Sequence, residues 1–314
     1  MDNVILYNMF EDKEVHFGFL CLFLSYKQRI FMNEGVSMSN IKRLCMLPNK
    51  EFLSYQPYLE LNTKYQSYIP IERNPIRDIV WEVYEVDDFD LEKTIALPDV
   101  CADIMTFYTK DNAFGYFMGG SISLQQMREL EFMKDVNSIF GVRLRTGMLG
   151  NLFRCDVKDI NDSRIAMSDA LWNGREIEEC MMKADNFIER WEIMSNYLEQ
   201  RVERNYKINN IVSYSVKKII ESKGCITIKE LEEDTGYTGR YLRKLVKEHL
   251  GISIKQFCEV TKFQWMCNYY KLSEGDVSLS ELALQAGYYD QSHMNLSCKK
   301  LTGELPKKII TMYA

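Results

Sequence analysis

Residues 228–251 read IKELEEDTGYTGRYLRKLVKEHLG and residues 279–303 read LSELALQAGYYDQSHMNLSCKKLTG, two copies of one pattern. Leu231 and Gly236 recur 51 positions later, and beyond the second glycine the shift becomes 52, so that Gly251 matches Gly303. One residue has therefore been added in the second copy. A short helix, a glycine turn with positive φ and a helix opened by a small hydroxyl or acidic residue are typical of a helix-turn-helix. Two such units in tandem indicate binding to DNA.

The second copy carries the longer motif. It reads Leu282-Ala283-x-x-x-Gly287-Tyr288-x-Asp290-x-Ser292-His293 and closes with Lys299-Lys300-x-x-Gly303-x-x-Pro306. With this motif, the segment from Tyr206 to Ala314 resembles the C-terminal DNA-binding domain of the AraC/XylS family of bacterial transcriptional regulators. Five residues differ from those that the family usually has at the same positions. Ile254 replaces proline, Leu296 replaces arginine, Cys298 replaces phenylalanine, Leu305 replaces serine or threonine, and Ile309 replaces tyrosine.

The resemblance implies a cytoplasmic transcription regulator, expected to be an activator, that needs no cofactor. Its implied partners are double-stranded DNA, a second copy of the chain, a small-molecule effector and RNA polymerase, with no membrane. Neither the operator nor the effector can be read from the residues.

The first recognition helix is predicted to begin after Thr238 as N-cap and to run to about His249. Leu242, Leu245 and Val246 recur at helical spacing and are expected to face the core of the unit, with the cations on or near the opposite face. Arginine can pair with guanine through two hydrogen bonds, worth roughly 1–3 kcal/mol of discrimination, whereas lysine more often meets phosphate. By the resemblance, the base-contacting positions of this helix are Arg240, Arg243 and Lys244.

The second recognition helix is predicted from about Asp290 to Leu301, with Met294 and Cys298 inward. By the resemblance, its base-facing positions are Gln291, Ser292, Asn295 and Leu296. Leu296 could touch only a thymine methyl group, so this helix is expected to read less specifically. The predicted phosphate contacts are Thr238, Lys247, Lys299, Lys300 and Lys307, and an ordinary solvated surface is the alternative for each lysine.

Residues 254–272 are apolar nearly all round, which predicts a helix buried between the two units. Such a connector would hold the recognition helices about one DNA turn apart, near 34 Å, so that both enter successive major grooves. Bending of the DNA is then expected.

The charge is divided unevenly along the chain. Residues 206–314 hold 16 Lys+Arg and 12 Asp+Glu, a net +4, and subtraction from the totals of 39 and 45 leaves 23 and 33 in residues 1–205, a net −10. The positive charge lies on the duplicated segment, as a polyphosphate partner requires. The nine cysteines form no C-x-x-C pair, and no Cys/His set has zinc-ligand spacing, so reduced thiols and no metal site are predicted.

The predicted class is α+β: a mostly β, mixed α/β N-terminal domain, a linker helix and an all-α C-terminal domain with two helix-turn-helix units. The predicted boundaries are an N-terminal extension at 1–50, a β-rich effector or regulatory domain at 51–172, a linker or dimerisation helix at 173–205 and the DNA-binding domain at 206–314. Short alternating segments predict strands in the second of these regions: Ile79–Val86, Asp103–Tyr108, Phe114–Met118 and Ile139–Arg145.

Two motifs of this region, residues 97–104 and 140–147, resemble an N-terminal domain that accompanies a subset of AraC-type regulators. A candidate effector site there consists of Cys101, Asp103, Arg143 and Arg145. Cys101 could serve a ligand pocket or a thiol sensor, or be a small core residue. The two arginines could bind an anionic effector, or simply form the solvent face of a half-buried strand.

The segment from Arg175 to Arg204 predicts one long helix with an apolar seam at spacings of three and four. This seam could pack against a second copy of the chain or against its own domain, and the resemblance favours dimerisation. The seam residues proposed for the dimer are Ile177, Met181, Ile188, Trp191 and Leu198. A linker is expected at 204–210.

An enzyme is not expected. Regulators that repair alkylated DNA need a Pro-Cys-His core and a four-cysteine zinc site, which this sequence lacks, and no Gly-rich phosphate loop or Ser/His/Asp set stands out. Two alternatives to a DNA-binding regulator with an N-terminal ligand-sensing or dimerisation domain remain open. One is an adaptor with weakened DNA contacts, and the other is a thiol-responsive regulator.

Overall fold

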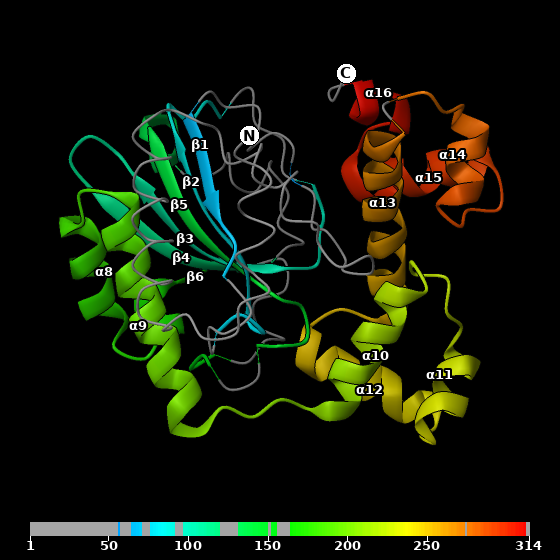
Figure 1. Cartoon of the computed structure of the whole chain (residues 1–314), viewed down its shortest axis with the longest axis horizontal. Coiled ribbons are helices and arrows are strands. Elements are labelled where there is room, and N and C mark those ends of the chain that lie inside the picture. The colour runs from blue at the N-terminus through cyan, green and yellow to red at the C-terminus, as the bar shows by residue number, and fades with distance from the viewer. Residues whose placement is uncertain are drawn as a thin grey trace, which may run out of the picture. The chain divides into compact units, whose positions relative to one another are not determined.

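The computed structural model describes residues 56, 64–70, 76–91, 97–119, 131–149, 152–155, 164–273 and 275–311. The predicted extension at 1–50 lies outside these residues. The class is α+β as expected, with an antiparallel sheet in the N-terminal region and helices in the C-terminal region (Figure 1).

Among the described residues, six strands form one antiparallel sheet in the order β1-β2-β5-β3-β4-β6. The strands are β1 (Lys64–Tyr68), β2 (Val80–Asp87), β3 (Ala102–Tyr108), β4 (Ala113–Gly119), β5 (Ser138–Leu144) and β6 (Arg164–Ala166). A 3₁₀ turn, η1 (Glu131–Asp135), precedes β5. The four strands predicted from alternation are therefore confirmed as β2 to β5, whereas β1 and β6 were not predicted.

The central strands β2, β3 and β5 are buried on both faces. On one face the ring of Phe140 packs edge-on against Phe187, and the hydroxyl of Tyr108 donates to the carbonyl of Met181 at 3.1 Å. Both partners come from helices that lie along the sheet (Figure 1). The other face carries an apolar cluster that includes Phe107. The expectation of a half-buried strand at 139–145 is therefore wrong for β5, because alternation identifies two faces but not what covers them.

The helices after the sheet are α7 (Met167–Ala170), α8 (Gly174–Lys183) and α9 (Phe187–Asn205). The single helix predicted over 175–204 is thus two helices. Asn186 begins the second one by accepting hydrogen bonds from the backbone N–H groups of Ile188 and Glu189, both at 3.1 Å. Such an N-cap needs extended backbone, which interrupts the helix although the apolar spacing continues across it.

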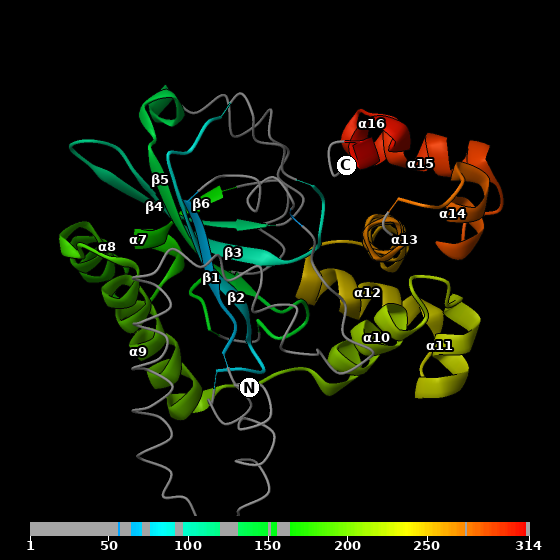
Figure 2. The same ribbon diagram turned by 45° about the horizontal axis from the view of Figure 1, so that its top comes forward.

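The C-terminal helices are α10 (Asn210–Glu221), α11 (Ile228–Thr235), α12 (Gly239–Leu250), α13 (Ile254–Leu272), α14 (Leu279–Gln285), α15 (Gln291–Thr302) and α16 (Pro306–Thr311). Helix α13 has the predicted bounds and lies at the centre of the C-terminal helices (Figure 2). Figure 2 looks almost along its axis, with α10 to α12 on one side and α14 to α16 on the other. It contributes Phe257 to the core of the first group and Phe263 and Met266 to the core of the second.

Candidate nucleic-acid interface

The first helix-turn-helix unit consists of α11, α12 and the turn between them. Thr227 and Glu230 form a capping box at the start of α11, which satisfies N–H groups that have no partner within the helix. Gly236 ends α11 with φ of 73°, as the sequence predicts. Thr238 is the N-cap of α12, and its hydroxyl accepts from the N–H of Tyr241 at 3.4 Å.

Helix α12 separates its side chains into two faces. Leu242 and Val246 are fully buried and Leu245 nearly so. The cations at the remaining positions are exposed: Arg240, Arg243, Lys244 and Lys247. The predicted base-contacting residues therefore lie together on the solvent side of one short helix, where a polyanion can reach them.

The second unit consists of α14, α15 and their turn. Ser278 caps α14, Gly287 adopts φ of 79°, and Asp290 caps α15 by accepting from the N–H of His293 at 2.7 Å. Met294 and Cys298 are fully buried, as predicted. Burial raises the pKa of the Cys298 thiol to about 12, so it stays a neutral core group.

The predicted base-facing residues of α15 differ in how accessible they are. Ser292 and Leu296 are exposed, whereas Gln291 and Asn295 are half-buried. The Gln291 carbonyl oxygen accepts from the hydroxyl of Ser280 at 3.0 Å, which leaves its amide N–H groups to donate to a base. Helix α15 therefore offers neutral groups where α12 offers cations.

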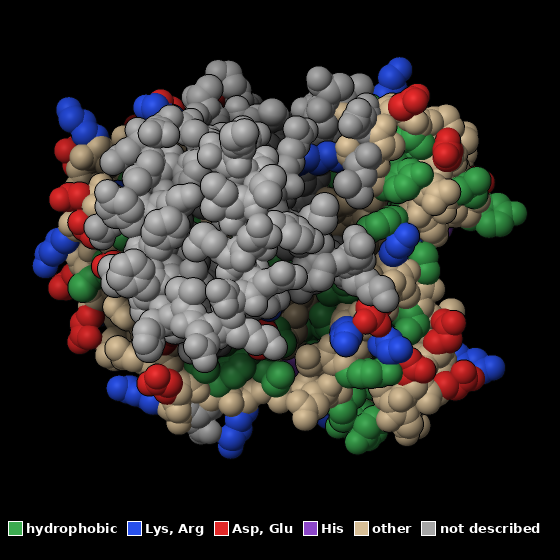
Figure 3. Space-filling model, in the orientation of Figure 1, with side chains coloured by type: hydrophobic (Ala, Val, Ile, Leu, Met, Phe, Trp, Pro, Cys, Tyr) green, Lys and Arg blue, Asp and Glu red, His purple; other side chains and the backbone are tan. Residues whose placement is uncertain are grey.

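The lysines that are predicted to contact phosphate are all exposed: Lys247, Lys299, Lys300 and Lys307. Lys300 already has a partner within the chain, since its ammonium lies 3.3 Å from the carboxylate of Glu259. Thr238 is exposed too, although its hydroxyl serves as the N-cap. In the view of Figure 3, the C-terminal helices expose lysine and arginine side chains next to apolar ones.

The turn of the second unit meets α13 and the loop after α10 at a junction that the sequence does not reveal. From α13, Lys262 donates to the carbonyl of Gly287 at 3.2 Å and Trp265 donates to the carbonyl of Gln285 at 3.2 Å. From the loop after α10, the ammonium of Lys223 lies 4.0 Å from the centre of the Trp265 ring. A Cβ atom at Gly287 would come within 2.3 Å of the Cys225 sulfur. The turn of the second unit is therefore held by the connector α13 and lies against the loop that follows α10.

In the N-terminal region, the strand register brings two predicted effector residues, Asp103 and Arg143, next to each other. Arg143 on β5 lies directly opposite Glu82 on β2 and Asp103 on β3. Its guanidinium Nε is 3.1 Å from Asp103 and 3.6 Å from Asp99, and Nη1 is 3.9 Å from Glu82. The hydroxyl of Tyr84 donates to Asp103 at 3.3 Å. Arg143 is only 4% exposed, so the prediction that it could lie on a solvent face is wrong.

We call Arg143 and its three carboxylate partners, Glu82, Asp99 and Asp103, the ion cluster. The side chains of the other two predicted effector residues make different contacts. Arg145 is half-buried; its guanidinium lies 4.5 Å from the centre of the Trp81 ring and donates to the carbonyl of Arg77 at 3.1 Å. Cys101 is buried, and its N–H donates to Asp99 at 3.0 Å. These geometries match core and packing roles.

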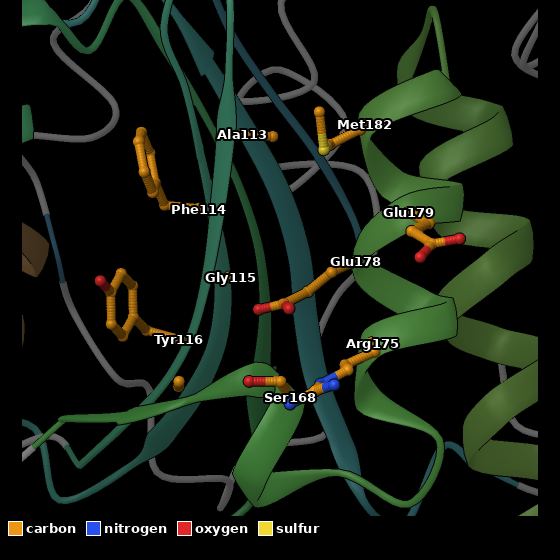
Figure 4. Close-up of a pocket in the computed structure, with 10 residues that line it drawn as sticks. Ala113, Phe114, Gly115, Tyr116, Ser168, Arg175, Glu178, Glu179 and Met182 are labelled. Atoms are coloured by element: carbon orange, nitrogen blue, oxygen red, sulfur yellow. The ribbon is translucent and has the colours of Figure 1, made fainter.

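A cleft of about 390 Å³ lies between β4 and α8 (Figure 4). Gly115 lines it on the strand side, while Phe114 and Tyr116 point to the opposite side of the strand. Glu178 extends from α8 toward β4, and burial raises the pKa of this carboxyl. No residue of the predicted effector site lines this cleft.

The predicted dimer seam is divided between the chain's own core and its surface. Ile177, Met181 and Leu198 are buried within the chain, which fits packing on the chain's own domain rather than on a partner. Ile188 and Trp191 are half-buried, and the Trp191 ring lies 5.9 Å from that of Tyr68.

Among the described residues, no group of three or more His, Cys, Asp and Glu side chains could hold a metal ion. Over the same ranges, every helix is too short or too polar to span a bilayer.

A family model described as a helix-turn-helix domain matches residues 231–311, which include both units. Among solved structures, the chain is similar to the C-terminal domain of AraT, a response regulator from Geobacillus stearothermophilus, at 22% identity and a TM-score of 0.31, covering 33% of this chain and 86% of that one. It is also similar to ToxT from Vibrio cholerae, at 12% identity and a TM-score of 0.38, covering 79% of this chain and 98% of that one. No curated protein matches the chain. With two capped units joined by α13, the C-terminal region of this chain is an AraC-type helix-turn-helix domain.

Proposed function

We propose that this chain is a sequence-specific DNA-binding regulator of transcription. The observation that carries the proposal is the exposed face of α12, where Arg240, Arg243 and Lys244 stand over a fully buried apolar side. Two arginines on one short helix fit the guanine edges of the major groove, and lysines supply contacts to phosphate.

The second unit supports the same proposal through its placement. Helix α13 packs against α12 on one side and against α14 and α15 on the other, and the junction at Gly287 adds hydrogen bonds between α13 and the second turn. A connector of this kind favours two recognition helices that enter successive major grooves together.

The experiment is a titration of the full chain with duplex DNA over a range of salt concentrations. Each phosphate neutralised by a lysine or arginine adds close to one unit to the slope of log affinity against log salt. We expect a steep slope, and Lys300→Ala should weaken binding to all duplexes alike. A slope near zero from low to moderate salt would contradict the proposal.

For the N-terminal region we propose ligand sensing or dimerisation. The cleft beside Glu178 supports a small-molecule role, because its volume lies within the usual range for ligand pockets. The half-buried Ile188 and Trp191 are the members of the seam that support a contact with a second copy. Sedimentation of Ile188→Asp tests the dimer: a folded monomer supports it, and an unchanged dimer moves the interface elsewhere.

An adaptor whose DNA contacts have weakened is a second candidate. Exposed Leu296 favours it, because an apolar side chain on the outer face of a recognition helix can also meet a protein. The salt titration separates the two functions, since an adaptor of this kind would not bind duplex DNA with a steep slope.

A further inference from the structure

The two recognition helices can be compared residue by residue. Each has 12 residues, begins after an N-cap and ends at a glycine with positive φ. The caps Thr238 and Asp290 are 52 positions apart in the sequence. The same shift aligns the buried Leu242 with the buried Met294. It also pairs three of the four exposed cations of α12 with residues of α15: Arg240 with Ser292, Arg243 with Asn295 and Lys244 with Leu296.

The second helix replaces these three cations by neutral side chains, while the fourth, Lys247, is matched by Lys299. Its lysines, Lys299 and Lys300, lie only in the last turn, and Lys300 is already paired with Glu259. The bidentate contact to guanine O6 and N7 is characteristic of arginine and lysine. The first two turns of α15 therefore lack the side chains that usually read guanine in that way.

The same helix presents apolar groups instead. Leu296 is 72% exposed and Tyr289, in the turn before the cap, is 86% exposed. Tyr289 is the residue added in the second copy, and its backbone N–H donates to Nδ1 of His293 at 3.2 Å, which ties the turn to the helix. Leu296 lies on the helix and Tyr289 in the turn that precedes its cap, so both exposed apolar side chains belong to the recognition element of the second unit.

In the major groove, the favourable partner of an apolar side chain is the C5 methyl group of thymine. Gln291, on the same helix, can add a hydrogen bond to an acceptor of that base pair, because its carbonyl oxygen accepts from Ser280 while its amide can donate.

We infer that the second unit recognises an A·T half-site through thymine methyl groups, with Leu296 and Tyr289 as specificity-determining residues. The first unit reads a guanine-containing half-site about one turn, near 34 Å, away. The operator is therefore asymmetric in composition, and the orientation of the chain on it is set by which half-site carries the thymines. This inference rests on the proposed DNA-binding function.

The test uses the full chain and duplexes selected by it from a random pool. In the bound sequences, each thymine of one half-site is replaced by deoxyuridine, which removes only the C5 methyl group. We expect a loss of affinity of about fourfold for each contacted methyl, the value of roughly one buried methylene. Replacement of thymines in the guanine-containing half-site should change little.

The variants locate the effect on the helix. Leu296→Ala should bind more weakly to the thymine duplex and lose part of its sensitivity to deoxyuridine, whereas Leu296→Arg should shift the preference at that base pair toward guanine. Leu284→Ala is the matched control, because Leu284 is also exposed, at 64%, but lies on α14 outside the recognition helix. Thermal unfolding of each variant confirms that it is folded.

The possible outcomes separate the inference from the function on which it rests. If no duplex is selected even at low salt, the proposed function fails. If duplexes are selected but deoxyuridine has no effect in either half-site, or guanine is selected under α15, the thymine inference is overturned. Unchanged DNA binding by Leu296→Ala would also overturn it.

Discussion

The two helix-turn-helix units are alike in their backbones and unlike in their surfaces. Both turn at a glycine with positive φ, both recognition helices begin at a side-chain cap, and both bury two side chains four residues apart. The first exposes cations at three positions where the second exposes neutral polar and apolar groups. The residues that form the fold are thus a different set from those that could read DNA, so a duplicated backbone does not require a duplicated chemistry.

The largest expected difference between the two units is the loss of stability when the glycine of each turn is replaced by alanine. A Cβ atom at Gly236 would meet nothing within 4 Å, whereas at Gly287 it would lie 2.3 Å from the Cys225 sulfur. Gly236→Ala should therefore cost about 1–2 kcal/mol of stability for the left-handed conformation alone. Gly287→Ala should cost a further 1–3 kcal/mol or so, because neighbouring atoms must move.

Urea unfolding of the full chain, followed by far-UV circular dichroism, measures this difference. The double variant Gly287→Ala with Cys225→Ala is the control, because it removes the sulfur and should recover part of the loss. Equal losses for the two single glycine variants would show that the contact with the loop after α10 does not restrict Gly287.

A smaller effect is expected for matching positions on the recognition helices. Arg243→Ala should lose roughly 1–3 kcal/mol of discrimination at one base pair, because it removes a side chain able to form two bonds to guanine. Asn295→Ala should lose less, since Asn295 is half-buried and neutral. Affinities for operator variants with single base changes give both values. If both variants lower affinity equally for every duplex, α12 does not read bases.

The smallest difference is expected at the caps. Asp290 accepts from its N–H partner at 2.7 Å and Thr238 at 3.4 Å. A charged cap also interacts favourably with the positive end of the helix dipole. Asp290→Ala should therefore lose more stability than Thr238→Ala, about 1–2 against about 0.5–1 kcal/mol. Thermal unfolding in the absence of DNA measures both, and a larger loss for Thr238→Ala would contradict the ranking.

Much of the C-terminal region could be predicted because its determinants are local. Caps, positive-φ glycines and helical spacing depend on neighbours in the sequence, and they gave α12, α13 and α15 to within a residue or so. The contacts of Lys262 and Trp265 with the second turn could not be predicted, since they join residues about 20 or more positions apart.

The N-terminal region depends more on distant contacts. The alternation at 142–145 gave the strand, but the burial of Arg143 depends on which strands lie beside it in the sheet. The apolar seam of α8 and α9 continues in step across residues 184–186, so spacing alone could not reveal the break that the Asn186 cap introduces. Site roles on the recognition helices remain predictions, although the structure places their residues on the expected faces.

The ion cluster around Arg143 also makes folding a proton-binding reaction. Three carboxylates surround one guanidinium, and burial raises the pKa of Asp103 to about 6 from its ordinary value of 3.8, although Arg143 acts in the opposite direction. Between these two values the folded chain keeps a proton that the unfolded chain has lost. The contribution of Asp103 to stability is therefore greatest below pH 4 and declines as the pH rises to about 6.

Mild acid should accordingly favour the folded sheet through this residue, opposite to the usual effect of acid on a paired carboxylate. Asp103→Asn should flatten the dependence of the unfolding free energy on pH between 4 and 6, and a dependence that is unchanged would place the proton elsewhere. Refolding of the chain near pH 5 would then withdraw protons from the buffer, so that the solution becomes measurably more alkaline as the sheet forms.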